Sequence, residues 1–378
     1  MKDQFLFVVV KHTRSLGASE DLVVAAAERM ATSGNAPAFW FNFRPPETDL
    51  RIKRLRAAKC QIHFHDWNDP LLRIRRRFSC SADRTAIESS LRSTIRTERP
   101  THIVLNQGGN SDASVEAPIL QQENVPYSVL CHAATESSWP GPDFLPAMRA
   151  IFSGAMQCLF VSEWIWQLTE VQVGMKFDNA TVVYNPCKFS TIQSSPWPPT
   201  NTAFSLAAVS RIENKQKGHD LILRTLALPE WRARPLNVTF YGEGPHRKTL
   251  ESYSDAIELD SIHFAGHVED IRAIWHRHHG FIQASRYEGY GLSLLEAMFC
   301  ERMAITTPIP AAREFMSEGE TGFLARAASV EEMSKALDRA WKHRTRWQEM
   351  GAAAAIRVEA DYPKDPVAEF MTLTRSFH

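Results

Sequence analysis

The amino-acid sequence predicts an α/β protein with two doubly wound parallel-sheet domains that face a cleft between them. Its 378 residues are 44% hydrophobic, which is enough chain for more than one core at about 150 residues per domain. Apolar, strand-like runs alternate with helical patterns in both halves, as in repeated βαβ units. A proline-rich stretch separates the halves, and we expect ligands outside the carboxyl ends of the strands.

The first half opens on a strand. Residues 5–10 are apolar on both faces, which is typical of a buried strand in a parallel sheet. Ser19 then offers a helix N-cap with Glu20 and Asp21 in the first turn, and this helix is expected to end at Gly34. Further strands are expected at residues 38–43, 103–105, 127–130, 158–161 and 181–184.

Residues 193–202 break this periodicity with prolines and small polar residues, which predicts a linker. The linker divides an N-terminal domain (1–192) from a C-terminal domain (203–360). Residues 361–378 are expected to form a helical tail, for which packing back on the first domain is one option. The second half repeats the strand pattern at residues 204–209, 236–241, 262–265, 280–284 and 303–306.

The strongest local signal follows the strand at residues 280–284. Gly289 and Gly291 let the backbone turn sharply and approach a ligand closely, just before a helix whose free N–H groups suit a diphosphate. Glu288 at the strand end and Glu296 one turn into the helix can accept hydrogen bonds from sugar and ribose hydroxyls. Acids that merely complement the helix dipole are the simpler alternative.

Two cations follow the strand at residues 204–209. Arg211 is a planar fork and Lys217, just before Gly218, is a point charge, and this combination suits a pyrophosphate. In isolation the same residues would be an exposed basic loop. Their position in the same domain as the glycine-rich acidic segment favours the binding site.

Together these segments resemble the retaining glycosyltransferases of family 4, which have the GT-B fold of two Rossmann-like domains. Glu288 and Glu296 match the E-x7-E signature, and residues 211–218 match the R-L-x(3–4)-K-G element. Residues 242–245 match the G-x-G-P element, and residues 264–268 match the F-x-G-x-V element.

The resemblance is less specific in the first half and has departures. Gly17, His132 and residues 162–163 and 183–186 look like family landmarks. The Gly-x-Pro-Val and G-G-x-x-E elements that usually follow the E-x7-E helix are absent, since residues 300–305 and 311–314 read differently. The Gly-Gly of the first loop is reduced to Gly17.

The resemblance implies that residues 1–192 form the acceptor-side domain and residues 203–360 the donor-binding domain. It also implies a role for each matched residue. Glu296 would bind the ribose, Glu288 the donor hexose, and Arg211 and Lys217 the leaving diphosphate. His132 would face the donor sugar, and Gly17 would let the first loop approach the diphosphate. The remaining donor contacts would come from the backbone at Val268, Gly289, Gly291, Leu292, Ser293 and Leu294.

The function implied is transfer of a hexose-type sugar, with retention, from a UDP- or GDP-linked donor to a glycan, lipid-linked or small-molecule acceptor, as in polysaccharide biosynthesis. No D-x-D pair offers metal ligands, so we expect no metal and no cofactor beyond the donor. The alternatives are a GT-B-fold nucleotide-sugar isomerase or epimerase and a non-catalytic nucleotide-sugar binding protein.

Charge and composition bear on location and partners. The net charge is +0, but residues 1–100 carry 18 Lys and Arg against 11 Asp and Glu. The basic runs at 51–56 and 73–77 suggest either a solvated face or peripheral contact with anionic membrane, and no nucleic acid is expected. Six scattered cysteines fit reduced thiols in a cytoplasmic protein, peripheral at the inner membrane face if the basic runs bind lipid.

Two further groups are expected to be structural. His276, His278 and His279 lack a Cys or carboxylate partner at ligand spacing, which favours a polar helix end over a metal site. The tryptophans at positions 139 and 197 are expected to serve packing or the linker rather than to form a platform for sugars.

Overall fold

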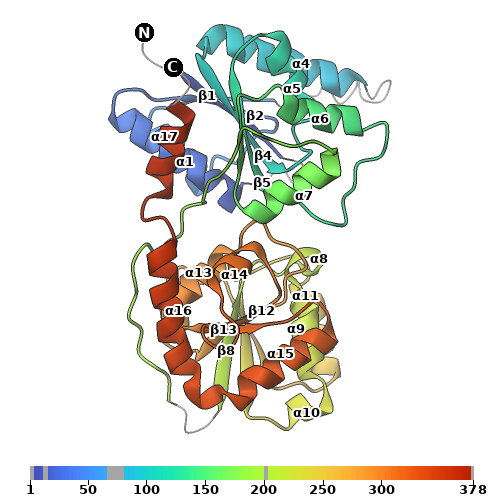
Figure 1. Ribbon diagram of the computed structural model, residues 1–378, viewed down its shortest axis with the longest axis vertical. Helices are drawn as coiled ribbons and strands as arrows, with labels where there is room; N and C mark the ends of the chain where they lie inside the picture. Colours follow the sequence, from blue (N-terminus) through green and yellow to red (C-terminus); the bar gives the residue numbers. More distant parts are fainter. Residues whose placement is uncertain (1–3, 12–15, 66–80, 200–202, 376–378) are drawn as a thin grey trace. The chain divides into compact units, whose positions relative to one another are not determined.

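The computed structural model describes residues 4–11, 16–65, 81–199 and 203–375. The chain forms two compact units, which we call the N-terminal unit (Met1–Pro186 with Asp365–His378) and the C-terminal unit (Cys187–Lys364). Each unit is a parallel sheet with helices packed on both faces (Figure 1).

The N-terminal unit has seven strands in the order β3-β2-β1-β4-β5-β6-β7. The strands are β1 (Phe5–Val10), β2 (Ala38–Phe41), β3 (Gln61–Phe64), β4 (His102–Gly109), β5 (Tyr127–Ala133), β6 (Gln157–Phe160) and β7 (Ala180–Val182). The helices are α1 (Ala18–Thr32), α2 (Leu50–Ala57), α4 (Ser81–Glu98), α5 (Glu116–Gln122), α6 (Leu145–Ser153), α7 (Glu163–Val173) and α17 (Pro366–Arg375). Strand order changes direction between β1 and β4, which makes that position the switch point of the sheet.

The C-terminal unit has six strands in the order β10-β9-β8-β11-β12-β13. The strands are β8 (Phe204–Val209), β9 (Leu236–Tyr241), β10 (Ile262–Gly266), β11 (Gly280–Gln283), β12 (Met303–Thr306) and β13 (Gly322–Leu324). The helices are α8 (Asn214–Lys217), α9 (His219–Leu226), α10 (Pro229–Arg232), α11 (Arg247–Ala256), α12 (Ile271–Trp275), α13 (Leu292–Phe299), α14 (Pro310–Phe315), α15 (Val330–Lys342), η1 (Arg344–Arg346) and α16 (Trp347–Asp361). The switch point of this sheet lies between β8 and β11.

These sheets confirm the predicted α/β class and the two doubly wound parallel sheets. Strand β1 is 0–2% exposed along its whole length, because helices cover both faces of the sheet. Within the described ranges, no helix is long and apolar enough to cross a membrane.

The start of α1 differs from the prediction. The N-cap is Gly17, and Ser19 lies inside the helix rather than capping it. The Glu20 carboxylate folds back and accepts a hydrogen bond from the Gly17 amide at 2.6 Å, as in the carboxylate half of a capping box. A glutamate three residues into the helix therefore does what Ser19 was expected to do.

The C-terminal helix α17 packs against α1 within the N-terminal unit. Asp365, just before α17, accepts two hydrogen bonds of 2.7 Å from Arg29 of α1. The same carboxylate accepts the Ala368 amide at 3.0 Å, so it stabilises the first turn of α17 as well.

Arg302 connects the residues before β8 to the rest of the C-terminal unit. Its guanidinium is 1% exposed and donates to the carbonyl groups of Trp275, His278 and Pro196 at 2.6–2.7 Å. Pro196 belongs to the stretch 193–199, which has no helix or strand of its own. Arg302 thus supplies the donors that buried carbonyl groups of three separate segments need.

We expect Arg302→Met to lower the free energy of unfolding by about 3 kcal/mol or more, since several buried carbonyl groups lose their only charged donor. Chemical denaturation measures the change. Arg272→Met, at an exposed position on α12, is the control and should be near neutral. Equal stability of the two variants would contradict the structural role of Arg302.

Candidate functional site

The predicted donor-binding residues of the C-terminal unit gather at the carboxyl edge of its sheet. Strands β8 and β11 pair in parallel, so the segments that follow them lie at the same edge. This is also where the strand order changes direction, the place at which open α/β sheets bind ligands. The segments 210–218 and 284–291 therefore form the candidate site of this unit.

An ion pair joins the two segments. Lys217 Nζ lies 2.7 and 2.8 Å from the two carboxylate oxygens of Glu288, which is 6% exposed. Glu288 also accepts hydrogen bonds from Ser285 Oγ at 2.7 Å and Gln283 Nε2 at 2.8 Å. These four bonds satisfy a buried carboxylate and fix the direction in which Lys217 points.

Gly218 makes the approach of Lys217 to Glu288 possible. It ends α8 in the left-handed conformation with φ of 65°. A Cβ atom at this position would lie 2.0 Å from the carbonyl oxygen of Ala284, which directly follows β11. Only glycine allows this turn and this contact together.

Arg286 holds the same two segments together and was not singled out from the sequence. Its guanidinium forms a two-pronged ion pair with Asp220 at 2.9 and 2.8 Å, and it donates to the Asn214 carbonyl at 2.5 Å. Its backbone amide donates to the Gln216 carbonyl at 2.7 Å. The one-turn helix α8, which carries Lys217, is therefore fixed at both its ends. The sequence feature that could have indicated this role is the position of the arginine, two residues before Glu288.

Arg211 is the other predicted cation of this edge. It is exposed and has no ion pair among the described residues, in contrast to Lys217. It lies close enough to the Tyr287 phenol to act on its pKa, although burial is the larger effect and raises that pKa. Arg211 is thus an uncommitted cation beside the ion-paired one.

The N-terminus of α13 provides backbone donors. Gly291 is its N-cap with φ of 109°, and a Cβ there would lie 2.5 Å from the Ile309 side chain. The Leu294 amide already donates to the Gly291 carbonyl at 3.0 Å. The amides of Leu292 and Ser293 have no partner within the described parts of the chain. Among the predicted amide positions 291–294, those of Leu292 and Ser293 are therefore open donors in the first turn of a helix.

Glu296 differs from Glu288 in its surroundings. It is 7% exposed, and its carboxylate makes no hydrogen bond with any residue that the structure describes. Burial raises its pKa to about 7, and Lys188 opposes this shift in part. Glu288 is held by four hydrogen bonds, whereas Glu296 is a buried acceptor without a hydrogen-bond partner among the described residues.

Gly289 and Val268 are the other two predicted donor contacts of this unit, and they lie on different segments. Gly289 is half-buried between Glu288 and Gly291. Val268 is half-buried in the loop after β10, an edge strand two positions from β8.

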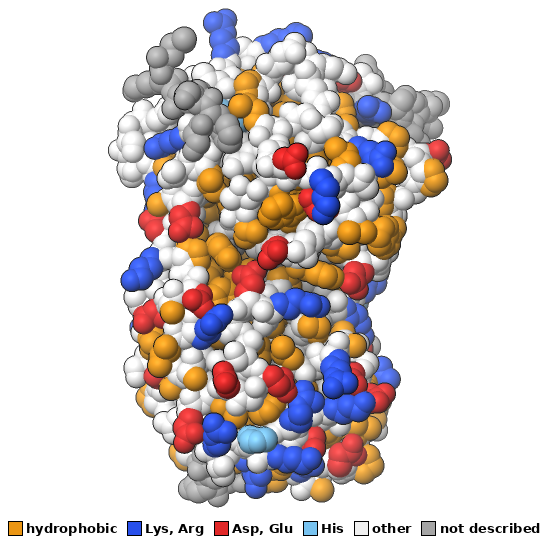
Figure 2. Space-filling view, in the orientation of Figure 1, with side chains coloured by type: hydrophobic (Ala, Val, Ile, Leu, Met, Phe, Trp, Pro, Cys, Tyr) orange, Lys and Arg blue, Asp and Glu red, His pale blue; other side chains and the backbone are white. Residues whose placement is uncertain are grey.

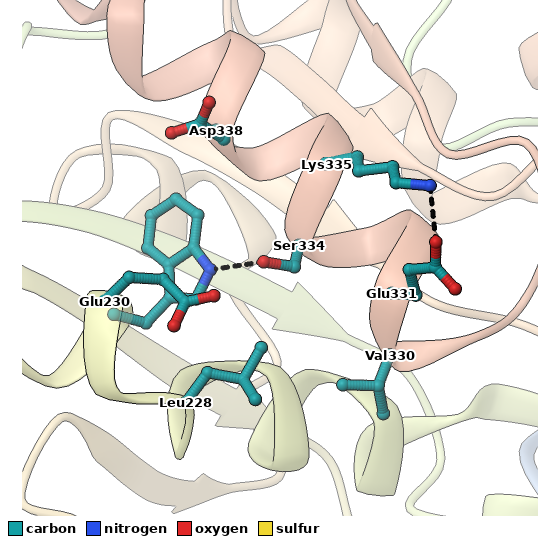
Figure 3. A pocket seen from close by; sticks show the side chains of 8 residues that line it. Leu228, Glu230, Val330, Glu331, Ser334, Lys335 and Asp338 are labelled. Carbon is teal, nitrogen blue, oxygen red and sulfur yellow. Dashed lines mark hydrogen bonds and ion pairs between the residues drawn. The ribbon is translucent and has the colours of Figure 1, made fainter.

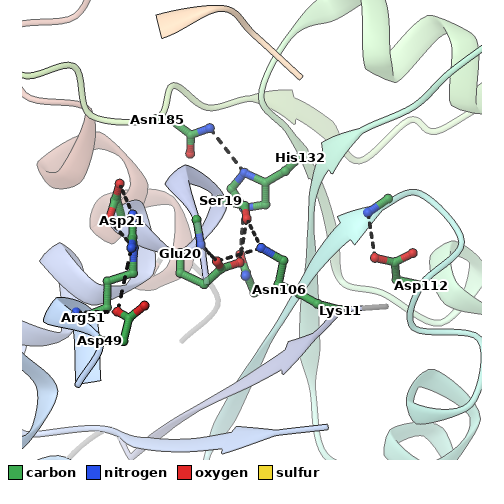
Figure 4. Close-up of polar contacts among 12 residues, drawn as sticks. Lys11, Ser19, Glu20, Asp21, Asp49, Arg51, Asn106, Asp112, His132 and Asn185 are labelled. Atoms are coloured by element: carbon green, nitrogen blue, oxygen red, sulfur yellow. Dashed lines mark hydrogen bonds and ion pairs between the residues drawn. The ribbon is translucent and has the colours of Figure 1, made fainter. Parts of the chain in front are cut away.

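His132 lies in the N-terminal unit, on β5. Its Nε2 donates to Asn106 Oδ1 at 2.8 Å, and its Nδ1 accepts from Asn185 Nδ2 at 3.3 Å (Figure 4). Burial, with Lys11 nearby, lowers the pKa of His132 to about 3. The imidazole is thus neutral, and both of its ring nitrogens are engaged within the N-terminal unit.

Gly17 begins α1 beside Lys11, which follows β1 at the switch point of this sheet. Lys11 Nζ lies 2.9 Å from the Glu20 carboxylate and 3.0 Å from Ser19 Oγ. Because the Gly17 amide also donates to Glu20, neither this amide nor Lys11 is an open donor (Figure 4). Neither Lys11 nor Glu20 was predicted from the sequence as a partner of the Gly17 loop. Residues 12–15 of this loop lie outside the described residues.

The two buried histidines of the 276–279 segment are structural. His278 Nε2 bonds the Tyr241 hydroxyl at 2.9 Å, and His279 Nδ1 accepts the Ser205 amide at 3.0 Å. They are core residues rather than the predicted polar helix end, since they are 4% and 2% exposed. In the described ranges, no three His, Cys, Asp or Glu side chains gather in a way that could hold a metal ion.

A pocket of about 530 Å³ lies away from these residues, between α10 and α15 (Figure 3). The indole of Trp231 donates to Ser334 Oγ at 2.8 Å, and Lys335 is paired with Glu331. Since these polar groups bond one another and no predicted site residue lines the pocket, we assign it no role in the chemistry.

The first basic run is largely neutralised. Arg51, Arg54 and Arg56 are paired with Asp21, Glu28 and Glu47, respectively. The second run, residues 73–77, lies outside the described residues. On the face of the C-terminal unit drawn in Figure 2, Lys and Arg side chains likewise lie among Asp and Glu.

Comparison with known proteins gives this geometry a context. Residues 203–343 match the model of the family described as "Glycosyl transferases group 1". The mannosyltransferase LpcC of lipopolysaccharide core biosynthesis from Rhizobium leguminosarum is 30% identical over 132 residues, which are 32% of this chain and 36% of LpcC. Glycogen synthase from Mycobacterium tuberculosis is 27% identical over 187 residues, 47% of this chain and 44% of the synthase. The chain spans 29–36% of the length of the first curated relatives it matches.

Similarity to solved structures extends over the whole chain. Anabaena Alr3699/HepE, solved in complex with UDP and glucose, has a TM-score of 0.77 at 16% identity and covers 100% of both chains. The chain therefore has the GT-B fold, and its residues 203–343 match the group 1 glycosyl transferases.

Proposed function

We propose that the protein is a retaining, metal-independent glycosyltransferase. It would move a hexose-type sugar from a UDP- or GDP-linked donor to a saccharide, lipid-linked or small-molecule acceptor. The observation that carries the proposal is the Lys217–Glu288 ion pair at the switch point of a sheet, within the segment that matches the group 1 family. The unpartnered Glu296 carboxylate and the open amides of Leu292 and Ser293 support it, since they offer partners for ribose hydroxyls and phosphate oxygens.

The proposed reaction develops negative charge on the leaving diphosphate, and the site must stabilise this charge. Breaking the bond between the anomeric carbon and the diphosphate oxygen leaves positive charge on the sugar and negative charge on the leaving group. In this proposal Arg211, Lys217 and the open amides of α13 stabilise the negative charge. The freed phosphate oxygen takes the proton of the acceptor hydroxyl, whose oxygen bonds the anomeric carbon on the same face.

The remaining side chains position the donor. Glu296 accepts hydrogen bonds from the ribose, and Glu288 orients Lys217 and accepts from the hexose. His132 contributes a neutral imidazole toward the donor sugar. Two of the relatives are named for lipopolysaccharide core biosynthesis and for glycogen synthesis, which supports a role in polysaccharide biosynthesis.

We expect Lys217→Ala to lower kcat by about 100-fold or more, the typical effect of removing a charge-stabilising donor. Lys215→Ala is a matched control, because Lys215 is exposed on the same one-turn helix. Release of UDP or GDP from their sugar conjugates measures turnover, after a thermal-shift comparison has shown which nucleotide binds. Near-normal turnover by Lys217→Ala would reject the assignment.

The same assay separates the alternatives. Nucleotide release that depends on a saccharide acceptor supports a transferase, whereas conversion of the donor without release indicates an isomerase. Activity that persists in EDTA supports the metal-free proposal, and loss that Mn²⁺ restores contradicts it.

Arg286 offers a test of how Lys217 is held. If Arg286 acts through Lys217, Arg286→Met should lower kcat about tenfold in the natural protein and have little further effect in Lys217→Ala. Arg224→Met, at an exposed arginine of α9, is the control. Independent, additive losses in the double variant would show that Arg286 contacts the donor itself.

Glu296 gives a prediction that needs no substrate. Its carboxyl has a pKa of about 7 when folded against an ordinary value of 4.5, so ionisation destabilises the fold as pH rises between these values. Glu296→Gln stays neutral and should be more stable than the natural protein by up to about 3 kcal/mol near pH 8, with no gain near pH 4. Denaturation curves at both pH values measure this. The control is Glu349→Gln at a 73% exposed side chain, and an equal gain there would refute the argument.

A further inference from the structure

The loop at residues 134–144 follows β5, the strand that carries His132, at the carboxyl edge of the N-terminal sheet. Two large aromatic side chains on it are exposed, Trp139 at 58% and Phe144 at 39%. The sequence-based expectation that Trp139 serves packing is therefore wrong. An exposed tryptophan beside the ligand-binding edge of a sheet calls for a functional explanation.

Hydrogen bonds from a buried side chain of α7 hold the backbone of this loop. Gln172 of α7 is 4% exposed and donates to the carbonyl groups of Thr135 and Ser138 at 2.8 and 2.9 Å. Gln172 in turn accepts from Asn110 Nδ2 at 2.7 Å, and Asn110 is 5% exposed. A buried amide pair thus fixes the backbone on which Trp139 sits.

The indole ring itself has a fixed direction. Its only polar atom, Nε1, donates to the carbonyl of Glu136 in the same loop at 2.8 Å. What Trp139 presents to solvent is therefore an apolar ring whose orientation is set before any ligand arrives. Pro140 and Pro142 restrict the backbone on its far side, which lowers the entropy that binding must remove.

The charge of the loop decides between kinds of ligand. Glu136 and Asp143 are exposed, and the stretch 134–144 contains no Lys or Arg. Anionic lipid and nucleic acid are bound by basic residues, so this surface suits neither. A sugar ring has an apolar face of C–H groups that can cover an aromatic ring, and hydroxyl groups that donate to carboxylates.

We propose that Trp139, with Phe144 and the neighbouring carboxylates Glu136 and Asp143, forms a binding surface for an uncharged saccharide acceptor. This inference rests on the proposed function, and it selects a saccharide from the acceptor classes considered above. Trp139 covers the face of a pyranose ring, and Gln172 is a positioning residue that keeps the loop in place.

The test compares four variants of the full chain on an array of neutral and acidic oligosaccharides, in the presence of UDP or GDP. Trp139→Ala should weaken capture of a neutral saccharide by about tenfold or more, and Trp139→Phe should retain most of it. Gln172→Met should weaken capture although it lies beneath the loop. Val171→Ala, at a 64% exposed apolar residue of α7, is the matched control and should bind normally.

Two further measurements keep the outcomes distinct. The thermal shift caused by the nucleotide should be the same in all variants; its absence in the natural protein would count against the proposed function, not the loop. Flotation with vesicles of phosphatidylcholine and phosphatidylglycerol should not depend on Trp139. The proposal is overturned if the natural protein captures no saccharide, or if Trp139→Ala captures it equally well. Vesicle binding that is lost in Trp139→Ala also overturns it.

Discussion

A buried ion pair between Lys217 and Glu288 links the ends of two neighbouring strands, and most of the C-terminal site follows from it. Either side chain alone would be a charge in a nearly closed setting, which is strongly unfavourable. The pair therefore requires the glycine at 218, which lets α8 touch the end of β11. It also requires the two further donors of Glu288, Ser285 Oγ and Gln283 Nε2. Arg286 fixes the same two segments by an independent set of bonds, so the cation is held in place before a donor arrives.

Glu288 and Glu296 belong to one short segment but differ in their hydrogen bonding. Glu288 accepts four hydrogen bonds from Lys217, Ser285 and Gln283. Glu296 accepts none from the described residues, and its pKa is raised. Buried acids with a strongly raised pKa and no hydrogen-bond partner among the described residues are enriched at ligand-binding and catalytic sites. The difference between the two residues is thus better support for a nucleotide-sugar site than their spacing.

Most of the fold could be predicted because parallel strands buried on both faces are continuous apolar runs, as in residues 5–10. Strands β3 and β13 were not predicted. β3 is a half-buried edge strand, and β13 has three residues, so neither carries a long apolar run. At the site, the glycines and acids were recognisable in sequence. The roles of Arg286 and Gln172 were not, because each depends on partners far along the chain. The bond between Lys11 and Glu20, nine residues on, was missed because Glu20 was expected only to complement the helix dipole. The exposure of Trp139 depends on the course of the loop at residues 134–144, which the sequence pattern does not predict.

The Glu20 carboxylate occupies the N-terminus of α1, so the two sheets differ in the donors that they offer to an anion. Both have a switch point, yet in the N-terminal unit a carboxylate of the chain itself, Glu20, takes the amide and the ammonium that an external anion would seek. A phosphate could bind there only by displacing a side chain that is 1% exposed. Among the described residues of the N-terminal edge, the first turn of α1 is therefore already occupied by a negative charge of the chain itself. Under the proposed function, the open backbone donors for a diphosphate are thus those of Leu292 and Ser293 on the C-terminal sheet.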